Sequence, residues 1–202
     1  MPLPASVRPN LTAPATGFPG PGRLRPDSGK PLALGTVASA SLPNPSQDLT
    51  LTPLVGRART LREQLTTFGL ASIVIDPYTN ESSWILDTAV RVLRQFSGAD
   101  VRTNFTITCD ADDARAFLGP YADEFVVFLD PDRSLVKGLG LTEIPAFVYL
   151  QNDGSIPASA QGWDAAEWNT VATAIAQNCA WSKPSLPAPG DPVAFRGTPA
   201  LV

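Results

Sequence analysis

The sequence predicts an α/β domain with a mixed central sheet and helices on both faces, flanked by proline-rich flexible tails. Three observations support this prediction. Between about residues 48 and 182, apolar runs of strand length alternate with amphipathic segments at helical spacing. The end of that region predicts a hairpin followed by a helix, which is typical of a sheet that mixes parallel and antiparallel strands. Both ends of the chain are rich in proline and lack apolar periodicity.

The proline-rich ends define the expected domain boundaries. Ten of the 21 prolines fall in residues 1–50 and five in residues 184–202. Segments with so few periodic apolar residues cannot offset the entropy lost when a chain is ordered. We therefore expect a disordered leader over residues 1–47, one domain over residues 48–182 and a disordered tail over residues 183–202.

Hydrophobic spacing predicts the elements in the first half of the domain. A short amphipathic segment over residues 60–68 precedes an apolar strand over residues 70–75. Apolar side chains at helical spacing then predict a helix with one buried face over residues 83–96. Alternating apolar side chains predict a strand over residues 101–109, and a helix is expected over residues 111–118.

The second half of the domain continues the alternation and then changes to a hairpin. A strand is expected over residues 125–129 and a short helix over residues 134–139, which a glycine ends. The next strand, over residues 146–150, is followed by the Asp153-Gly154 turn. This turn type predicts a hairpin with a further strand near residues 155–160.

The last helix has a recognisable start. Asp164 is expected to cap its first turn, with Glu167 three residues later as the capping-box partner. The apolar residues that follow recur at helical spacing and predict a face that packs against the sheet. The expected members of this inward face are Trp168, Val171, Ala172, Ile175 and Cys179.

One combination of segments resembles a known family. Residues 142–150 contain Ile144-Pro145 before an apolar strand, and they are followed by residues 152–154, an Asn-Asp-Gly turn, and by Gly162-Trp163. Together these segments resemble the second half of the thioredoxin fold, and the resemblance as a whole covers about residues 65–180. The resemblance implies a thioredoxin-like fold in which the Ile144-Pro145 peptide bond is cis and leads into a central strand.

The order of the elements refines this resemblance. The chain has one strand–helix step more than a plain thioredoxin, and that step spans residues 101–118. With residues 129–141 leading to Ile144-Pro145, this insertion resembles the peroxiredoxins and the membrane-tethered thiol reductases of the thioredoxin superfamily.

The resemblance also implies where redox cysteines would stand. They would follow the strand at residues 71–76, on the loop over residues 77–84, but that loop contains no cysteine. A thiolate at a helix N-terminus is stabilised there, whereas a serine hydroxyl cannot exchange with a disulfide. The peroxiredoxin pattern Pro-x-x-x-Thr-x-x-Cys is also missing, since Pro77 and Thr79 stand at the wrong spacing. We therefore expect no catalytic residue.

What the resemblance implies instead is a binding groove. In the family, the proline before the central strand borders a groove that receives an extended partner peptide. The residues that would line this groove here are Tyr78, Thr79, Asn80, Ser82, Ser83, Trp84, Ile144 and Pro145. Two alternatives stay open: Asn80, Ser82 and Ser83 can cap a helix, and Tyr78 and Trp84 can belong to the core.

The two cysteines differ in their surroundings. Cys179 lies on the apolar face of the last helix and is expected to behave as a small hydrophobic residue. Cys109 ends a strand and is the candidate reactive thiol, although the aspartates that follow it would raise its pKa. A disulfide between them is not expected in a reducing compartment.

Composition excludes several kinds of site. The chain has no histidine, so neither a Ser-His-Asp nor a Cys-His system can form, and a metal site would rest on carboxylates alone. The clustered aspartates are expected to be helix caps and turn residues rather than metal ligands. They are Asp110, Asp112, Asp113, Asp130 and Asp132. No metal and no cofactor is therefore expected.

Charge and hydropathy limit the partners. Residues 48–182 contain nine basic and 17 acidic residues, a poor surface for nucleic acid, whose binding requires lysine and arginine. No apolar run reaches the roughly 18 residues of a membrane span, and prolines interrupt residues 1–22 where a secretory signal would lie. We expect a cytoplasmic protein whose partner is another, unidentified protein.

Three hypotheses about function remain. The first is a redox-inactive thioredoxin-like binding or scaffold protein that holds a partner segment beside Pro145. The second is a single-cysteine thiol protein, an oxidoreductase or redox sensor, that uses Cys109. The third is a structural subunit that binds through its proline-rich tails, as extended segments do.

Overall fold

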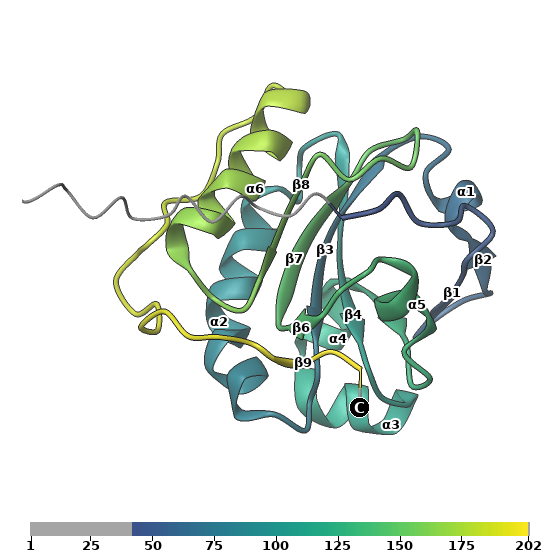
Figure 1. Ribbon diagram of the computed structural model, residues 1–202, viewed down its shortest axis with the longest axis horizontal. Helices are drawn as coiled ribbons and strands as arrows, with labels where there is room; N and C mark the ends of the chain where they lie inside the picture. The colour runs from purple at the N-terminus through teal and green to yellow at the C-terminus, as the bar shows by residue number, and fades with distance from the viewer. Residues whose placement is uncertain (1–41, 202) are drawn as a thin grey trace, which may run out of the picture. The chain divides into compact units, whose positions relative to one another are not determined.

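The computed structural model describes residues 42–201 of the chain. Within them lies a seven-stranded mixed sheet in the order β2-β1-β5-β4-β3-β7-β8, with helices packed on both faces (Figure 1). The central strands β3, β4 and β5 are parallel, and the remaining neighbours pair antiparallel. These strands are β1 Thr50–Pro53, β2 Arg59–Thr60, β3 Gly69–Ile75, β4 Val101–Ile107, β5 Val126–Leu129, β7 Ala146–Leu150 and β8 Ala158–Gln161.

Six helices in the described part of the chain connect and cover these strands. They are α1 Leu61–Gln64, α2 Asn80–Gln95, α3 Ala111–Leu118, α4 Tyr121–Glu124, α5 Ser134–Gly138 and α6 Ala165–Asn178. A second, two-stranded sheet joins β6 Glu143–Ile144 to β9 Thr198–Pro199. The expected mixed sheet with helices on both faces is thus confirmed.

Strand β3 lies between two apolar clusters. All seven of its residues are buried, and alternate side chains enter different clusters. Ile73 and Ile75 pack with side chains of α2 and α6, while Leu70 and Val74 pack on the opposite face with side chains of α1 and α5. A strand covered on both faces has a continuous apolar run, which is why this strand is visible in the sequence.

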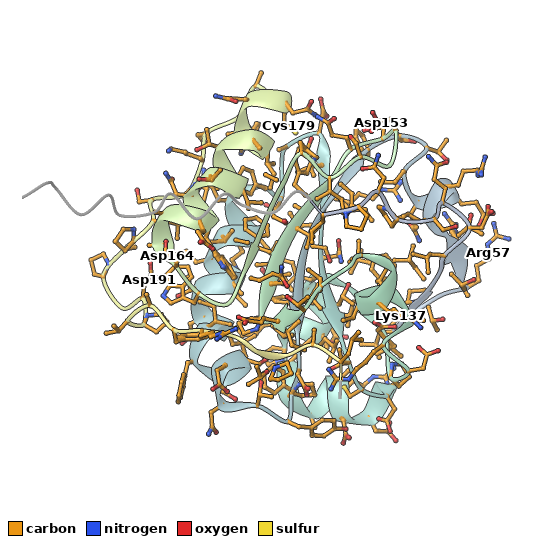
Figure 2. The ribbon with its side chains drawn as sticks, in the orientation of Figure 1. Arg57, Lys137, Asp153, Asp164, Cys179 and Asp191 are labelled. Atoms are coloured by element: carbon orange, nitrogen blue, oxygen red, sulfur yellow. The ribbon has the colours of Figure 1, made fainter. Side chains whose placement is uncertain are left out.

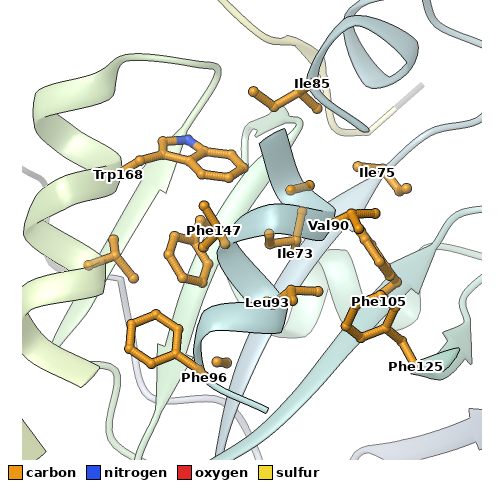
Figure 3. Close-up of a cluster of buried hydrophobic side chains, with 14 of the residues drawn as sticks. Ile73, Ile75, Ile85, Val90, Leu93, Phe96, Phe105, Phe125, Phe147 and Trp168 are labelled. Atoms are coloured by element: carbon orange, nitrogen blue, oxygen red, sulfur yellow. The ribbon is translucent and has the colours of Figure 1, made fainter. Parts of the chain in front are cut away.

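Helix α6 is fixed on the sheet by a tryptophan. Trp168 is fully buried between Phe147 of β7 and Trp163, with ring centroids 5.2 Å and 5.1 Å away (Figure 3 shows Trp168 and Phe147). Its indole N–H donates to the Gly162 carbonyl at 2.9 Å. Asp164 caps the helix as expected, accepting from the backbone N–H groups of Ala166 and Glu167.

Several elements were not anticipated. The strands β1, β2, β6 and β9 and the single-turn helix α4 are each four residues long or shorter. Strands β2, β6 and β9 have only two residues each, too few for a hydrophobic period to develop. Helix α2 begins at Asn80, three residues before the predicted start at residue 83.

The largest difference concerns the C-terminal segment. The sequence predicted a flexible tail from residue 183, but the structure places residues 183–201 along the domain, running past α2 to β6 (Figure 1). Asp191, marked in Figure 2, accepts from the Arg91 guanidinium at 2.5 Å and from the Thr88 hydroxyl at 2.8 Å. Its side chain is only 4 % exposed.

Polar contacts explain why spacing did not predict this ordered tail. Arg91 donates to the Ser185 carbonyl, Gln95 donates to Ser182, and the Trp181 indole donates back to the Gln95 carbonyl. These contacts are hydrogen bonds between α2 and the segment that follows α6, and they leave no apolar period in the sequence. Prolines also restrict the unfolded chain, so ordering such a segment costs less entropy than its composition suggests.

The N-terminal boundary also differs slightly from the expected one. Leu42 is buried in the apolar cluster on the side of the sheet covered by α1 and α5. The Gln47 amide donates to the Asp153 carbonyl, so residues 42–47 belong to the domain. The prediction for residues 1–41 lies outside the described residues. Among residues 42–201, no helix combines the length and the apolar character needed to cross a membrane.

Replacing Trp168 with alanine should strongly destabilise the domain. The change removes a fully buried indole and leaves a cavity between the sheet and α6, which typically lowers the free energy of unfolding by about 3–5 kcal/mol. Urea unfolding followed by circular dichroism measures this loss. The matched control is Val55→Ala on the exposed β1–β2 turn, which should change the free energy of unfolding by less than about 0.5 kcal/mol.

Candidate functional site

The candidate site lies at the carboxyl end of β3, where the chain turns into α2. Thr79 is the N-cap residue of α2, and its hydroxyl lies 2.9 Å from both the Asp76 carbonyl and the Ser82 hydroxyl. Ser82 is fully buried and accepts from the Asp76 backbone N–H at 2.9 Å. Both hydroxyls therefore stabilise the start of α2 by hydrogen bonds, and the buried Ser82 hydroxyl is not available to a ligand.

Tyr78 is turned toward α3. Its backbone N–H donates to the Asp76 carboxylate, and its hydroxyl donates to the carboxylate of Asp113 in the first turn of α3. Because that hydrogen bond favours the protonated phenol, it raises the pKa of Tyr78 to about 12. Asn80 and Ser83 are exposed on the first turn of α2. The structure thus holds Tyr78 against α3 by a side-chain hydrogen bond.

Trp84 makes a different contact. Its indole is 55 % exposed and meets the ring of Phe195 edge to face, with centroids 5.6 Å apart. Phe195 comes from the C-terminal tail, which the sequence did not place near this site. Trp84 is therefore neither a core residue nor the wall of an empty groove, since one edge of it is covered by the tail.

Ile144 and Pro145 are buried, and the peptide bond between them is cis. The backbone on the N-terminal side of this bond pairs antiparallel with β9, Glu143 opposite Pro199 and Ile144 opposite Thr198. Beyond that pair, the Ala200 N–H donates to the Thr142 carbonyl at 2.8 Å.

The tail also pairs with the turn between β8 and α6. Trp163 and Phe195 exchange two backbone hydrogen bonds, each 2.9 Å long. Gly162, the residue before Trp163, donates to the Pro145 carbonyl at 2.7 Å, which joins this turn to the cis bond. We call Thr142–Ile144 together with Trp163 the β6 edge. The chain's own residues 195–200 lie along this edge. Of the residues predicted to line a peptide-binding groove, Ile144 pairs with this segment and Trp84 contacts Phe195.

A buried ion pair connects the site to the tail. Asp76 is 5 % exposed, and its Oδ2 accepts from Arg133 Nη2 at 2.6 Å. Arg133 Nη1 donates to the Ala200 carbonyl at 2.7 Å. The sequence analysis missed Arg133, although a signal existed: Asp76 ends an apolar strand, and a buried carboxylate requires a cation nearby.

The two thiols are separated by the full length of β4. Cys109 follows the end of this strand, whereas Cys179 at the end of α6 donates to the Asp100 carbonyl just before the strand begins. Because Cys109 lies beyond one end of β4 and the Cys179 thiol lies beside the other, a strand of seven residues at about 3.3 Å per residue separates the two sulfur atoms by more than roughly 20 Å. Figure 2 marks Cys179 at the end of α6 opposite Asp164. Both cysteines are free.

The environment of Cys109 disfavours its thiolate. The side chain is 3 % exposed and donates to the Asp110 carbonyl. Burial, followed by the negative charges of Asp113, Asp110 and Asp76, raises the pKa of Cys109 to about 12. Burial also raises the pKa of Cys179. Cys109 directly precedes Asp110, the N-cap of α3, but the carboxylates of that first turn oppose the thiolate, and no cation lowers the pKa of either thiol.

The aspartates at this end of the sheet act as helix caps, as predicted. Asp110 accepts from the backbone N–H groups of Asp112 and Asp113, each at 3.0 Å. Asp130 is buried at the start of α5 and accepts from two backbone N–H groups and the Ser134 hydroxyl. Their carboxylates satisfy backbone donors that the first turn of a helix leaves unpaired.

Solved structures with a similar fold are distant in sequence. A secreted disulfide oxidoreductase of Mycobacterium tuberculosis, homologous to E. coli DsbE, is 17% identical, with a TM-score of 0.51 over 63% of this chain and 96% of that one. The bacterioferritin comigratory protein of Xanthomonas campestris, described for its alkyl peroxide reduction activity, is 17% identical, with a TM-score of 0.53 over 70% and 96%. A PrxQ variant from Xylella fastidiosa gives 14% identity and a TM-score of 0.54 over 69% and 96%.

These similarities, together with the described topology, establish a thioredoxin-like fold for this chain. The resemblance drawn from Ile144-Pro145 and the Asn-Asp-Gly turn is thereby confirmed at the level of the fold. No family model matches the sequence, and no curated protein matches it either.

Removing the cation of the buried pair should destabilise the domain. Arg133→Met leaves the Asp76 carboxylate buried without its partner, which should lower the free energy of unfolding by about 3–5 kcal/mol. Arg62→Met is the matched control, because Arg62 and Asp48 form an exposed pair worth less than about 1 kcal/mol. Urea denaturation of both variants measures the difference. Equal stability of the two variants would contradict the structural role of the Asp76–Arg133 pair.

Alkylation of Cys109 should be slow and strongly pH-dependent. A pKa raised from 9.0 to about 12 lowers the thiolate fraction at pH 8 by roughly a thousandfold relative to an unfolded chain. The rate should therefore rise about tenfold per pH unit from pH 8 toward pH 11 while the protein stays folded. Iodoacetamide labelling, read by mass spectrometry of the Cys109 peptide, measures this rate, with the urea-unfolded chain as reference. A native rate within tenfold of the unfolded rate at pH 8 would contradict this environment.

Proposed function

We propose that this chain is a binding protein that holds an extended peptide segment along the β6 edge and carries out no thiol redox chemistry. The observation that supports this most is the pairing of β9 with β6. The Thr142 carbonyl accepts from the Ala200 N–H, and Ile144 pairs with Thr198. Backbone pairing of this kind with an added strand is a means by which proteins recognise extended peptides. Such contacts give affinity, and the surrounding side chains give specificity.

The absence of cysteine from residues 77–84 supports the second half of the proposal. In place of a thiol, the start of α2 carries Ser82, whose hydroxyl is occupied by the Asp76 backbone. The pKa of Cys109 is about 12, and Cys179 lies at the other end of β4, so neither serves as an exchanging thiol or as the resolving partner of the other. The disulfide and peroxide activities of the similar proteins are therefore not part of the proposal.

Charge supports a peptide rather than a nucleic acid as the partner. The domain is acidic, and the β6 edge itself carries Glu143, whose carboxylate pairs with Arg196 of the tail at 2.6 Å. An acidic edge that accepts an arginine side chain suits a protein segment of neutral or positive charge. A phosphate backbone would be repelled there.

Selection from a display library of random 12-residue peptides tests this function. We expect enriched peptides to bind the full chain and to protect the backbone amides of the β6 edge from hydrogen exchange. Trp84→Ala should weaken their binding by up to about tenfold, equivalent to about 1.4 kcal/mol, because Trp84 flanks the edge. Val55→Ala, which removes an exposed apolar side chain on the β1–β2 turn, should leave binding unchanged.

Two results would contradict the proposal. One is a set of enriched peptides that bind elsewhere and are unaffected by Trp84→Ala. The other is catalytic reduction of insulin disulfides with dithiothreitol as the electron donor. Turnover that disappears with Cys109→Ser would instead favour the single-cysteine hypothesis.

A further inference from the structure

We propose that residues 195–200, which we call the distal tail, are an intramolecular ligand of the β6 edge, and that a partner segment binds by replacing them with the same residue pattern. This inference rests on the proposed function, because it names the kind of segment that the edge accepts. The pattern is an aromatic residue, any residue, glycine, threonine, any residue and a small residue.

The distal tail uses contacts that another strand can reproduce. Ala200 donates to the Thr142 carbonyl, and Phe195 exchanges two backbone hydrogen bonds with Trp163. Between these points, Ile144 and Thr198 lie opposite each other in an antiparallel pair. Backbone hydrogen bonds do not depend on side-chain identity, so an incoming strand replaces each of them without loss.

Side chains restrict which strand fits. A Cβ atom at Gly197 would lie 2.9 Å from both the Ile144 carbonyl oxygen and the Glu143 Cβ. Gly162 has a positive φ of 72°, and a Cβ there would lie 2.8 Å from the Gly197 nitrogen. The two backbones therefore touch across a pair of glycines, and any larger residue at position 197 forces the strand away from the edge.

The remaining positions of the pattern follow from burial. Phe195 packs edge to face on Trp84. Ala200 is completely buried in the apolar cluster on the side of the sheet covered by α1 and α5. The Thr198 hydroxyl donates to the Ile144 carbonyl at 3.1 Å. By contrast, Arg196 is 86 % exposed in its side chain and Pro199 is exposed, so these two positions tolerate variation.

The distal tail is held separately from the rest of the C-terminal segment. Residues 182–192 are fixed by the Arg91–Asp191 pair and by the Trp163 indole, which donates to the Pro192 carbonyl at 2.8 Å. The next residue, Val193, is 89 % exposed and connects this fixed part to Phe195. The distal tail can therefore leave the β6 edge while Asp191 keeps its partners.

The connection makes the distal tail a strong competitor. A short tether gives an effective concentration in the millimolar range. If the distal tail binds with an intrinsic Kd of about 100 µM and its effective concentration is about 1 mM, roughly a tenth of the molecules have a β6 edge that the tail does not occupy. A partner segment then binds the full chain about tenfold more weakly than it binds an edge without the tail.

Hydrogen exchange of the wild-type chain tests whether the tail opens locally. We expect the amides of Trp163, Phe195 and Ala200 to exchange together, at least a hundredfold faster than the amides shared by β3 and β7. Exchange of these three amides only at the rate of global unfolding would overturn the inference. It would also close the edge to any partner and so contradict the proposed function.

A peptide experiment tests the pattern itself. The probe is a fluorescein-labelled peptide of residues 192–202, added to the full chain carrying Gly197→Val, whose own distal tail no longer fits. We expect its Kd to be at least tenfold lower than for the wild-type chain. A Val193→Ala chain, altered at the exposed connection, should behave as wild type, and a probe carrying Gly197→Val should not bind. If Gly197→Val impairs folding, the milder Phe195→Ala chain replaces it.

The outcomes separate the two proposals. Fast local exchange without binding of the 192–202 probe to the Gly197→Val or Phe195→Ala chain overturns the intramolecular ligand and its pattern. In that case, library peptides that bind at the β6 edge would still support the proposed function. Binding of the probe together with fast exchange supports both proposals.

Discussion

The buried carboxylate of Asp76 organises this end of the molecule. Asp76 ends the central strand β3, and its backbone and side chain together fix Tyr78, Thr79 and Ser82 at the start of α2. Burying a charge without a partner is strongly unfavourable, so the fold must bring a cation to this point. Arg133 supplies it from the turn after β5, in a left-handed backbone conformation with φ of 55°. The same guanidinium then holds the Ala200 carbonyl, so one ion pair connects the strand, the helix start and the tail.

The long buried elements of the fold were predictable, and the short ones were not. Strand β3 and helix α6 were predicted because each has enough apolar residues for its hydrophobic spacing to be recognised. Strand β3 and the inward face of α6 are buried as predicted, except that Cys179 is only partly buried. Strand β9 is short and takes its partner from a distant part of the chain, so nothing local marks it. The ordered tail was missed for a related reason, since Asp191 and Arg91 are about 100 residues apart and no local pattern links them.

The sequence placed the candidate site at Ile144-Pro145 and at the start of α2, because these segments carry a family resemblance. The structure gives the Ile144-Pro145 bond as cis, whereas the surroundings of the other candidate residues could not be predicted. The sequence could not reveal that Tyr78 turns to Asp113 or that Ser82 is buried, since both depend on side-chain directions set by tertiary contacts. Nor could it reveal that the chain itself covers the edge, because Phe195 lies in a proline-rich segment without apolar periodicity.

Pro199 in β9 has a consequence for self-association. Because Ala200 directs its N–H toward β6, the neighbouring position 199 faces the other way, along the free side of the tail strand. An unpaired strand edge normally offers a row of N–H donors that can recruit another chain and begin aggregation. A proline at this place removes one donor from that row. Pro199 therefore leaves one donor fewer on the free side of β9, which disfavours the addition of a further strand to the small sheet.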